Sequence, residues 1–119
     1  MIIKTDLTKR DEFKEYVNRN KFCLVKVSAS WCKPCKRMKP LFEKLVGTLN
    51  NKVHIVLVDA DDGMDIYSYL KCKSIPYMVL YVDGQPTHIL MSSKDDQVTT
   101  FFSKVRKDTS DMDFLTDNF

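Results

Sequence analysis

Two short apolar stretches separated by a helical pattern constrain the fold of this chain more than any other feature. Residues 22–28 and 53–58 are mostly apolar, which indicates strands buried on both faces. Between them, apolar residues recur at helical spacing from Met38 to Leu49. Two buried strands joined by a helix form a parallel crossover unit, so the sequence predicts an α/β protein.

Further patterns predict elements on both sides of this unit. Pro40 should kink the first long helix without ending it, because the apolar spacing continues to the Asn50-Asn51 pair. The sequence Thr8-x-x-Asp11 resembles a helix start, and Asp83-Gly84 is a hairpin turn signal. We therefore expect strands at 2–5, 77–82 and 87–91, and helices after Thr8, at 66–70 and at 98–105. The order predicts parallel strands joined by helices, with one terminal hairpin.

Length and cysteine content limit the class of protein. The chain has 119 residues and 44% hydrophobic content, which suffice for one domain with a core that needs no disulfide or metal support. Four cysteines are too few for a secreted disulfide framework. No apolar stretch has the length of a signal peptide or a membrane span. These features predict a cytoplasmic protein with no membrane partner.

Charge is unevenly distributed along the chain. Residues 108–119 contain four aspartates and no basic residue, whereas residues 1–107 hold 19 basic and 12 acidic residues, a net charge of +7. We expect a single domain over 1–107 and a flexible acidic tail over 108–119. The basic residues around position 35 form either an ordinary solvated helix face or a positive rim that steers acidic partners toward the site.

The chemistry of the chain is concentrated in Ser30-Trp31-Cys32-Lys33-Pro34-Cys35-Lys36. Two thiols three residues apart at a helix start can exchange with a disulfide, and the thiolate is the attacking form. Cys32 lies where free N–H groups and the helix dipole stabilise an anion, and Lys33 adds positive charge. Cys32 is therefore the expected nucleophile and Cys35 the resolving thiol. Pro34 suits the first helical turn, where a missing N–H costs little.

The chain resembles the thioredoxin family. The resemblance rests on Trp31-Cys32-Lys33-Pro34-Cys35-Lys36, on Pro40, on Ile75-Pro76 before a strand and on the Asp83-Gly84 turn, and it covers residues 1–107. It implies the thioredoxin fold, a central mixed β-sheet flanked by helices on both faces. It also implies reduction of protein disulfides through a redox-active Cys32–Cys35 disulfide, without another cofactor. The electrons would come from a donor similar to thioredoxin reductase.

The same resemblance assigns roles around the cysteines. Trp31 would cover one side of the site with its indole ring. Pro76 would follow a cis peptide bond and lie against the cysteines, which leaves the backbone of Ile75 free to pair with a substrate strand. Tyr77 stands where thioredoxins often carry threonine, and we expect it to narrow the substrate groove.

Two positions depart from the family pattern. Lys26 stands where thioredoxins usually have a buried aspartate that assists proton removal from the resolving thiol, and Ile55 falls near the place of that aspartate's partner lysine. Lys26 either extends out of the sheet into water or points toward the thiols. In the second case Lys26 and Lys33 should both favour thiolates, stabilise the reduced form and raise the reduction potential.

The remaining cysteines have a simpler interpretation. Cys23 and Cys72 are expected to pack as small apolar side chains, although Lys71 and Lys73 leave a secondary redox or dimerisation role open for Cys72. We expect no metal site, because no second Cys-x-x-Cys or paired histidine follows at zinc-finger spacing.

Three functions remain in view at this stage. The leading one is a protein-disulfide reductase. The second is a disulfide oxidase or isomerase with a raised potential, and the third is an interaction module that uses the fold without the chemistry. We expect a monomer, and no nucleic-acid partner, because no interleaving of aromatic and basic residues accompanies the positive charge.

Overall fold

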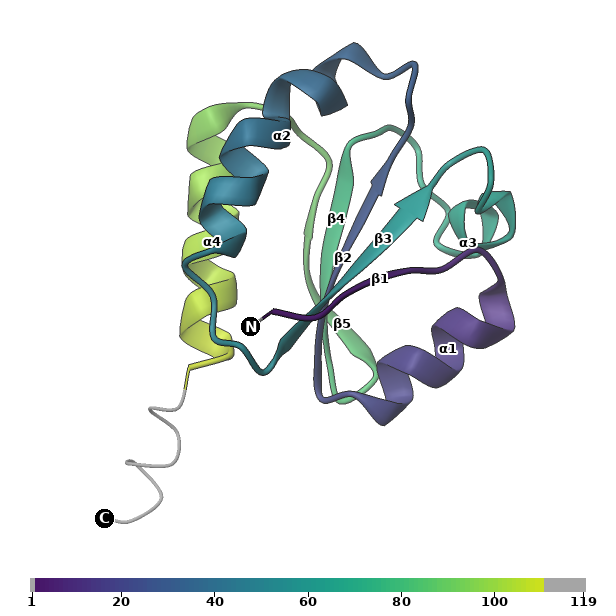
Figure 1. Ribbon diagram of the computed structural model, residues 1–119, viewed down its shortest axis with the longest axis horizontal. Helices are drawn as coiled ribbons and strands as arrows, with labels where there is room; N and C mark the ends of the chain where they lie inside the picture. Colours follow the sequence, from purple (N-terminus) through teal and green to yellow (C-terminus); the bar gives the residue numbers. More distant parts are fainter. Residues whose placement is uncertain (1, 111–119) are drawn as a thin grey trace.

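The structure is a computed structural model that describes residues 2–110. Its elements are β1 (Lys4–Asp6), α1 (Arg10–Arg19), β2 (Phe22–Ser28), α2 (Lys33–Val46), β3 (Val53–Asp59), α3 (Met64–Tyr69), β4 (Tyr77–Val82), β5 (Gln85–Leu90) and α4 (Asp95–Asp108). The five strands form one sheet in the order β1-β3-β2-β4-β5 (Figure 1).

The sheet is mixed, as predicted. Strands β1, β3 and β2 are parallel, whereas β4 runs antiparallel to β2 and to β5. The turn between β4 and β5 has positive φ at both Asp83 and Gly84 (52° and 80°), which is the backbone of a tight hairpin with matching twist. Asp83-Gly84 thus forms the predicted hairpin turn.

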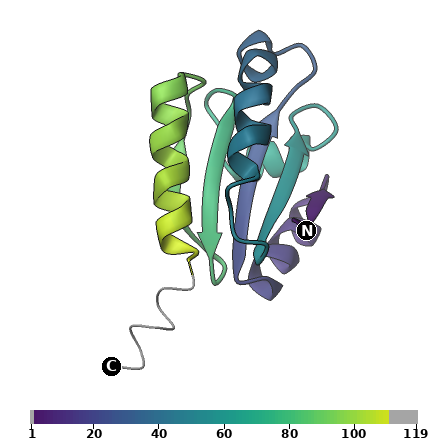
Figure 2. The same ribbon diagram turned by 60° about the vertical axis from the view of Figure 1, so that its left-hand side comes forward.

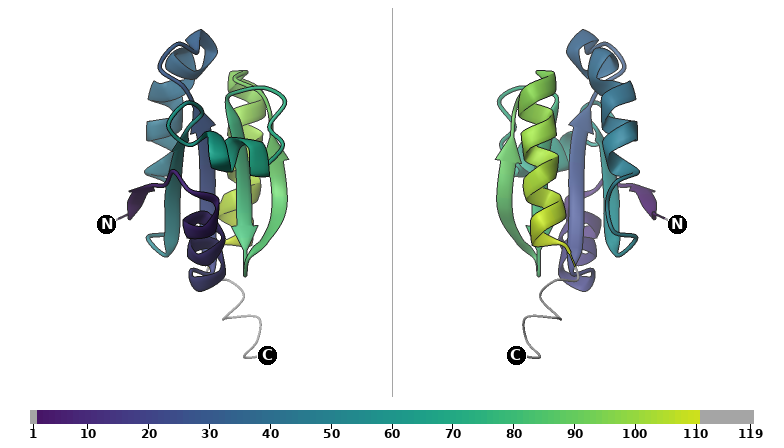
Figure 3. Two further views of the ribbon diagram at one scale, coloured as in Figure 1. Left: turned by 90° about the vertical axis from the view of Figure 1, so that its right-hand side faces the viewer. Right: turned by 90° about the vertical axis from the view of Figure 1, so that its left-hand side faces the viewer.

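Helices cover both faces of the sheet. Helices α1 and α3 lie on one face, and α2 and α4 lie on the other (Figures 1 and 2). Figure 3 shows the two faces from opposite sides, with α1 and α3 facing the viewer in one view and α4 with α2 in the other. The predicted fold class, a central mixed sheet with helices on both faces, is therefore confirmed.

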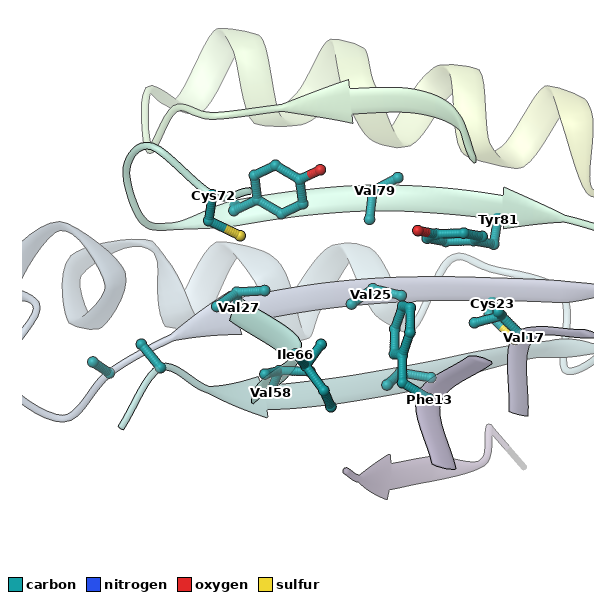
Figure 4. Packing of buried hydrophobic residues seen from close by; sticks show 14 of the residues in the cluster. Phe13, Val17, Cys23, Val25, Val27, Val58, Ile66, Cys72, Val79 and Tyr81 are labelled. Atoms are coloured by element: carbon teal, nitrogen blue, oxygen red, sulfur yellow. The ribbon is translucent and has the colours of Figure 1, made fainter. Parts of the chain in front are cut away.

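Each face has its own core. On the α1 and α3 side, Phe13 and Ile66 pack with buried sheet residues that include Val25 and Val79 (Figure 4). On the α2 and α4 side, the rings of Phe42 and Phe102 meet edge to face with centroids 5.8 Å apart. This geometry is the favoured one for aromatic pairs.

The central strand β2 serves both cores because its side chains alternate between the two faces. Cys23, Val25 and Val27 belong to the α1 and α3 core, and Leu24 belongs to the α2 and α4 core. Lys26 shares the parity of Leu24, so it is a charged residue placed on the face of the sheet that α2 covers.

Several predicted boundaries were wrong. Helix α2 ends at Val46, short of the predicted end at Asn50. Leu49 is buried, but it lies in a turn after the helix, where its N–H donates to the Val46 carbonyl. Thr8 is not the cap of α1: the N-cap is Lys9, without a side-chain hydrogen bond. Pro40 is exposed on the outside of α2, and the helix continues past it as expected.

The predicted division into a domain over 1–107 and an acidic tail over 108–119 stays a prediction. Helix α4 runs to Asp108, so the proposed boundary falls inside its last turn. Residues 111–119 lie outside the described part of the chain.

Candidate active site

The cysteine pair lies at the point where β2 leaves the sheet and α2 begins. Cys32 is the N-cap of α2, and Cys35 lies in its first turn. The two residues form a disulfide, with Cα atoms 5.3 Å apart. The backbone N–H of Cys35 donates a hydrogen bond to Cys32 Sγ over 3.2 Å. This donor points at the atom that carries the negative charge when the disulfide is reduced.

The first turn of α2 is positive in character. It contains no acidic residue, and Lys33 is exposed directly after the N-cap. Pro34 occupies the second helical position, where its missing N–H removes no helical hydrogen bond. The dipole of a 14-residue helix and the ammonium of Lys33 both favour an anion at Cys32.

The loop before β4 covers the cysteines from another side. The Ile75-Pro76 peptide bond is cis, as the family resemblance implied. Pro76 is buried, and the carbonyl oxygen of Ile75 lies 3.8 Å from Cys32 Sγ. Because of this packing Cys32 is only 4% exposed. Its access to a substrate comes from the groove beside it.

This groove runs along Cys32 between α2 and the loop that precedes β4. Trp31, Lys33 and Pro34 line it on the α2 side, and Tyr67, Lys73, Ser74 and Ile75 complete it. Trp31 is 63% exposed, and its Nε1–H donates to the carboxylate of Asp61 over 2.9 Å. Two groove residues, Tyr67 and Ser74, were not assigned to the site from the sequence, and Lys73 was noted only as a flank of Cys72. Lys73 and Ser74 directly precede Ile75-Pro76, and that adjacency was the available signal.

Tyr77 has a different place from the one expected. Its side chain is buried in the α1 and α3 core, 6% exposed, and it is absent from the described residues that line the groove around Cys32. The reason is strand parity: Tyr77 lies opposite Val27 of β2, and both side chains face away from α2. Tyr77 therefore does not narrow this groove.

The comparisons with known proteins agree with this geometry. A family model described as Thioredoxin matches residues 4–106. The chain belongs to the thioredoxin family.

Its thioredoxin relatives vary in how much of their own length is matched. Thioredoxin of Coprinus comatus is 30% identical over 95 residues, covering 79% of this chain and 90% of that protein. The bifunctional thioredoxin reductase/thioredoxin of Mycobacterium leprae is 28% identical over 92 residues, covering 77% of this chain and 20% of that protein. Thioredoxin Y1, chloroplastic, of Arabidopsis thaliana is 34% identical over 77 residues, covering 64% of this chain and 45% of that protein. The chain thus spans less than half the length of two of these relatives.

Solved thioredoxin structures share the fold. Plasmodium falciparum thioredoxin superposes with a TM-score of 0.76 at 26% identity, covering 84% of this chain and 97% of that one. Mitochondrial thioredoxin 3 of Saccharomyces cerevisiae superposes with a TM-score of 0.75 at 28% identity, covering 87% and 94%. The chain therefore has a thioredoxin fold over most of its length.

The main departure from the thioredoxin pattern is Lys26, and the structure places it beneath α2. The residue is 9% exposed, and its Nζ lies 4.1 Å from the centroid of the Phe42 ring. It lines a pocket that Cys35 and Glu43 also line. Of the two placements left open by the sequence, extension into water does not occur: the ammonium lies against the Phe42 ring, about two helical turns beyond Cys35 on α2.

The surroundings of Lys26 lower its pKa. Burial is the main cause, because an ammonium loses hydration under α2. The carboxylate of Glu43 raises the pKa in part, whereas Lys39 and Lys4 lower it further. Glu43 is itself engaged in an ion pair with Lys4 at 2.8 Å, which is the main reason for its own lowered pKa. Lys26 thus has a shared carboxylate and an aromatic face in place of a dedicated ion-pair partner.

Ile55 does not replace the missing partner of Lys26. It is fully buried in the α2 and α4 core and pairs with Leu24 in the sheet, whereas the residues beside Lys26 are Leu57 and Met78. The carboxylate and lysine that thioredoxins commonly have here are both absent.

The other two cysteines, Cys23 and Cys72, lie in the core on the α1 and α3 side. Cys23 is fully buried, and burial raises its pKa from 9.0 to about 12. Cys72 is 9% exposed, and burial raises its pKa to about 11. Figure 4 shows both among the core side chains. Their position supports core packing, and a raised pKa disfavours the thiolate that redox chemistry needs.

Two further findings concern the part of the chain that the structure describes. Residues 2–110 contain no group of three or more histidine, cysteine, aspartate or glutamate side chains that could hold a metal ion. None of the helices described there is long and apolar enough to span a membrane.

Proposed function

We propose that this protein is a thiol–disulfide oxidoreductase that reduces disulfides of protein substrates through Cys32 and Cys35. One observation carries the proposal: Cys32 Sγ caps α2, accepts the Cys35 N–H and borders an open groove. A sulfur in that position is stabilised as a thiolate and can be reached by a substrate disulfide.

The reaction starts from the reduced protein. The Cys32 thiolate attacks one sulfur of a substrate disulfide, forms a mixed disulfide and releases the other substrate sulfur as a thiolate, which takes a proton from water. Cys35 then loses its proton and attacks Cys32 Sγ. The Cys32–Cys35 disulfide forms, the second substrate thiol leaves, and two electrons have passed to the substrate. The short Cα separation of 5.3 Å places both sulfurs within reach of each other.

The surrounding residues have positioning roles in this proposal. Trp31 and Pro34 form part of the groove wall. The backbone of Ile75, at the edge of the groove, pairs with an extended substrate segment, and buried Pro76 fixes the loop that presents it. Lys33 stabilises the thiolate of Cys32.

The electron donor follows from the same chemistry. The oxidised pair must be returned to the dithiol by a partner similar to thioredoxin reductase, and the Mycobacterium leprae relative is named as combining both proteins. A reducing compartment such as the cytoplasm suits two unpaired thiols in the core, Cys23 and Cys72. Related proteins are named as chloroplastic or mitochondrial, so membership of the family does not by itself determine the compartment.

The test is reduction of insulin disulfides with dithiothreitol as the electron source. Wild type should accelerate insulin precipitation, and Cys32→Ser should abolish the acceleration. Cys72→Ala is the matched control, because it removes a thiol outside the pair and should retain activity. With Cys35→Ser, a mixed disulfide between Cys32 and the substrate should accumulate. A wild type without activity would leave the fold as an interaction module and overturn the proposal.

A second direction of electron flow is favoured by two lysines on the elements that carry the cysteine pair. Lys26 shares a pocket with the resolving cysteine, and Lys33 follows the nucleophile. Positive charge near both sulfurs stabilises thiolates relative to the disulfide and so raises the reduction potential. A protein of this kind is a weaker reductant and a better oxidant or isomerase than a thioredoxin with a buried carboxylate. Equilibration with glutathione measures the reduction potential and so distinguishes a reductant from an oxidant or isomerase.

A further inference from the structure

The groove beside Cys32 carries unbalanced positive charge. Of the eight residues that line it, Lys33 and Lys73 are cationic and none is acidic. Both lysines are exposed, and within residues 2–110 neither forms an ion pair. They come from separate elements, Lys33 from the start of α2 and Lys73 from the loop that leads to the cis peptide bond.

The nearby carboxylates are engaged elsewhere. Asp61 accepts the indole N–H of Trp31 at 2.9 Å. Asp59 accepts the backbone N–H groups of Asp61 and Asp62 at 2.8 and 3.0 Å. Further along α2, Lys36 and Arg37 are exposed and extend the positive surface. Neither of these carboxylates pairs with Lys33 or Lys73, so the two ammonium groups can act on a bound segment.

The rest of the groove suits an extended polypeptide. The indole of Trp31 is largely exposed, and the side chains of Tyr67 and Ile75 are half-buried, so they offer apolar contact area. Such a surface accepts the apolar part of a segment while the lysines at its margin recognise charged side chains.

We infer that this groove selects substrates in which aspartate or glutamate flanks the disulfide, with Lys33 and Lys73 as the recognising residues. The inference rests on the proposed function and adds its substrate class. An acidic side chain beside the attacked cystine meets an ammonium on entering the groove, whereas a basic side chain meets two like charges. The occupant is an acidic segment of another protein.

The size of the effect follows from the exposure of the lysines. Solvent-exposed charge pairs change an equilibrium by a factor of about two to five each, so two pairs give about a tenfold preference for acidic over neutral flanks. The preference must shrink with salt, because the screening length falls from about 10 Å at 0.1 M to about 3 Å at 1 M.

The test uses three disulfide-bridged peptides of equal length, with glutamate, glutamine or lysine on both sides of the cystine. Pre-reduced full-length protein is mixed with each peptide, and the second-order rate of reduction is measured by acid quench and chromatography. Wild type should reduce the glutamate peptide about tenfold faster than the glutamine peptide and the lysine peptide more slowly still. One molar salt should remove most of the difference.

Variants separate recognition from chemistry. Lys73→Gln should lower the glutamate-to-glutamine rate ratio about threefold, and Lys33→Gln should lower the same ratio. Lys107→Gln removes an exposed charge in the last turn of α4, at the other end of the molecule (Figure 2), and should leave the ratio unchanged. Melting temperatures of all variants check that each is folded.

The outcomes are distinct. Equal rates for the three peptides, or an unchanged ratio in Lys73→Gln, would overturn the inference and leave the reductase function intact. If Lys73→Gln accelerated the reduction of all three peptides equally, Lys73 would instead bind acidic residues of this chain, such as Asp111, Asp113 and Asp117, that compete with every substrate. That result would also overturn the inference. Failure to reduce any peptide would remove the proposed function together with the substrate class.

Discussion

The ammonium of Lys26 lies 4.1 Å above the ring of Phe42, inside the space between the sheet and α2. Only 9% of the residue is exposed, so the charge has lost most of its water. The face of an aromatic ring attracts a cation, which compensates for part of that loss. The same pocket is lined by Cys35, which lies in the first turn of α2, about two turns before Phe42.

Replacing Lys26 should therefore change the reduction potential. A protonated Lys26 stabilises the Cys35 thiolate and leaves the neutral disulfide unaffected, so Lys26→Met should lower the potential by about 10–30 mV. Lys33→Gly should shift it in the same direction. Lys44→Met, an exposed position in the last turn of α2, is the control. Equilibration with glutathione measures all four proteins, and a single common potential would contradict the role of both lysines.

The stability of the protein should carry a pH signature of the same residue. Burial lowers the pKa of Lys26 from 10.5, so between the folded and the unfolded value the unfolded chain binds more protons. The contribution of Lys26 to the free energy of unfolding thus rises as the pH rises through this window toward 10.5. At about pH 7, Lys26→Met should be more stable than wild type by about 1 kcal/mol, since an ill-compensated buried charge is removed.

That advantage should shrink toward about pH 10. The ionisation of Cys23, Cys72 and Tyr81, whose pKa values burial raises to about 12, 11 and 12, works in the opposite direction. These groups are common to both proteins and cancel in the difference. Urea unfolding at several pH values gives that difference, and a constant gap between the two proteins would show that Lys26 titrates normally.

The end of helix α3 offers a stabilising substitution. Lys71 has a positive φ of 56°. Its N–H donates to the carbonyl oxygen of Ser68, and the N–H of Cys72 donates to that of Tyr67. These two bonds form a Schellman motif, in which lysine occupies the position that favours glycine. Lys71→Gly should raise the free energy of unfolding by up to about 1 kcal/mol, because a left-handed backbone is strained with a β-carbon. Lys71→Ala, which keeps the β-carbon, should not. Thermal or urea unfolding decides, and equal stability of the two variants would refute the strain.

The nucleophilic thiol and the two core thiols should differ in reactivity. In the reduced, folded protein, iodoacetamide at about pH 8 should modify Cys32 first. Cys23 and Cys72 should react only on unfolding, because a pKa of about 11 leaves about a thousandth of a thiol ionised at that pH. Mass spectrometry after short labelling identifies the modified residue. Fast labelling of Cys72 in folded protein would instead support the secondary redox role that its flanking lysines suggested.

The sequence was sufficient where periodicity and local chemistry agree. Strands β2 and β4 have the predicted bounds, and the Asp83-Gly84 turn has the backbone that its residues favour. Helix ends were less well predicted. Leu49 continues the apolar spacing of α2 but lies in a turn after the helix. Apolar spacing alone does not distinguish a residue inside a helix from one in the turn that follows it.

Tyr77 shows the limit of the same reasoning at the site. Its position next to Pro76 suggested a groove residue, yet the side chain is buried in the α1 and α3 core, because strand parity turns it to the same face of the sheet as Val27. Lys73 was noted in the sequence only as one of the two lysines that flank Cys72. The loop before the cis peptide bond brings it into the groove.

The sequence by itself determined the reacting pair and the elements that flank it, because a Cys-x-x-Cys at a helix start and the periods of strand and helix are local properties. Only the tertiary structure decided what surrounds Cys32 and Cys35. The packing of α2 on β2 encloses Lys26 with Phe42 and Cys35, and the loop before β4 adds Ile75 and Lys73 to the groove. Burial and charge at a site depend on segments far apart in sequence, so they appear only when the chain is folded.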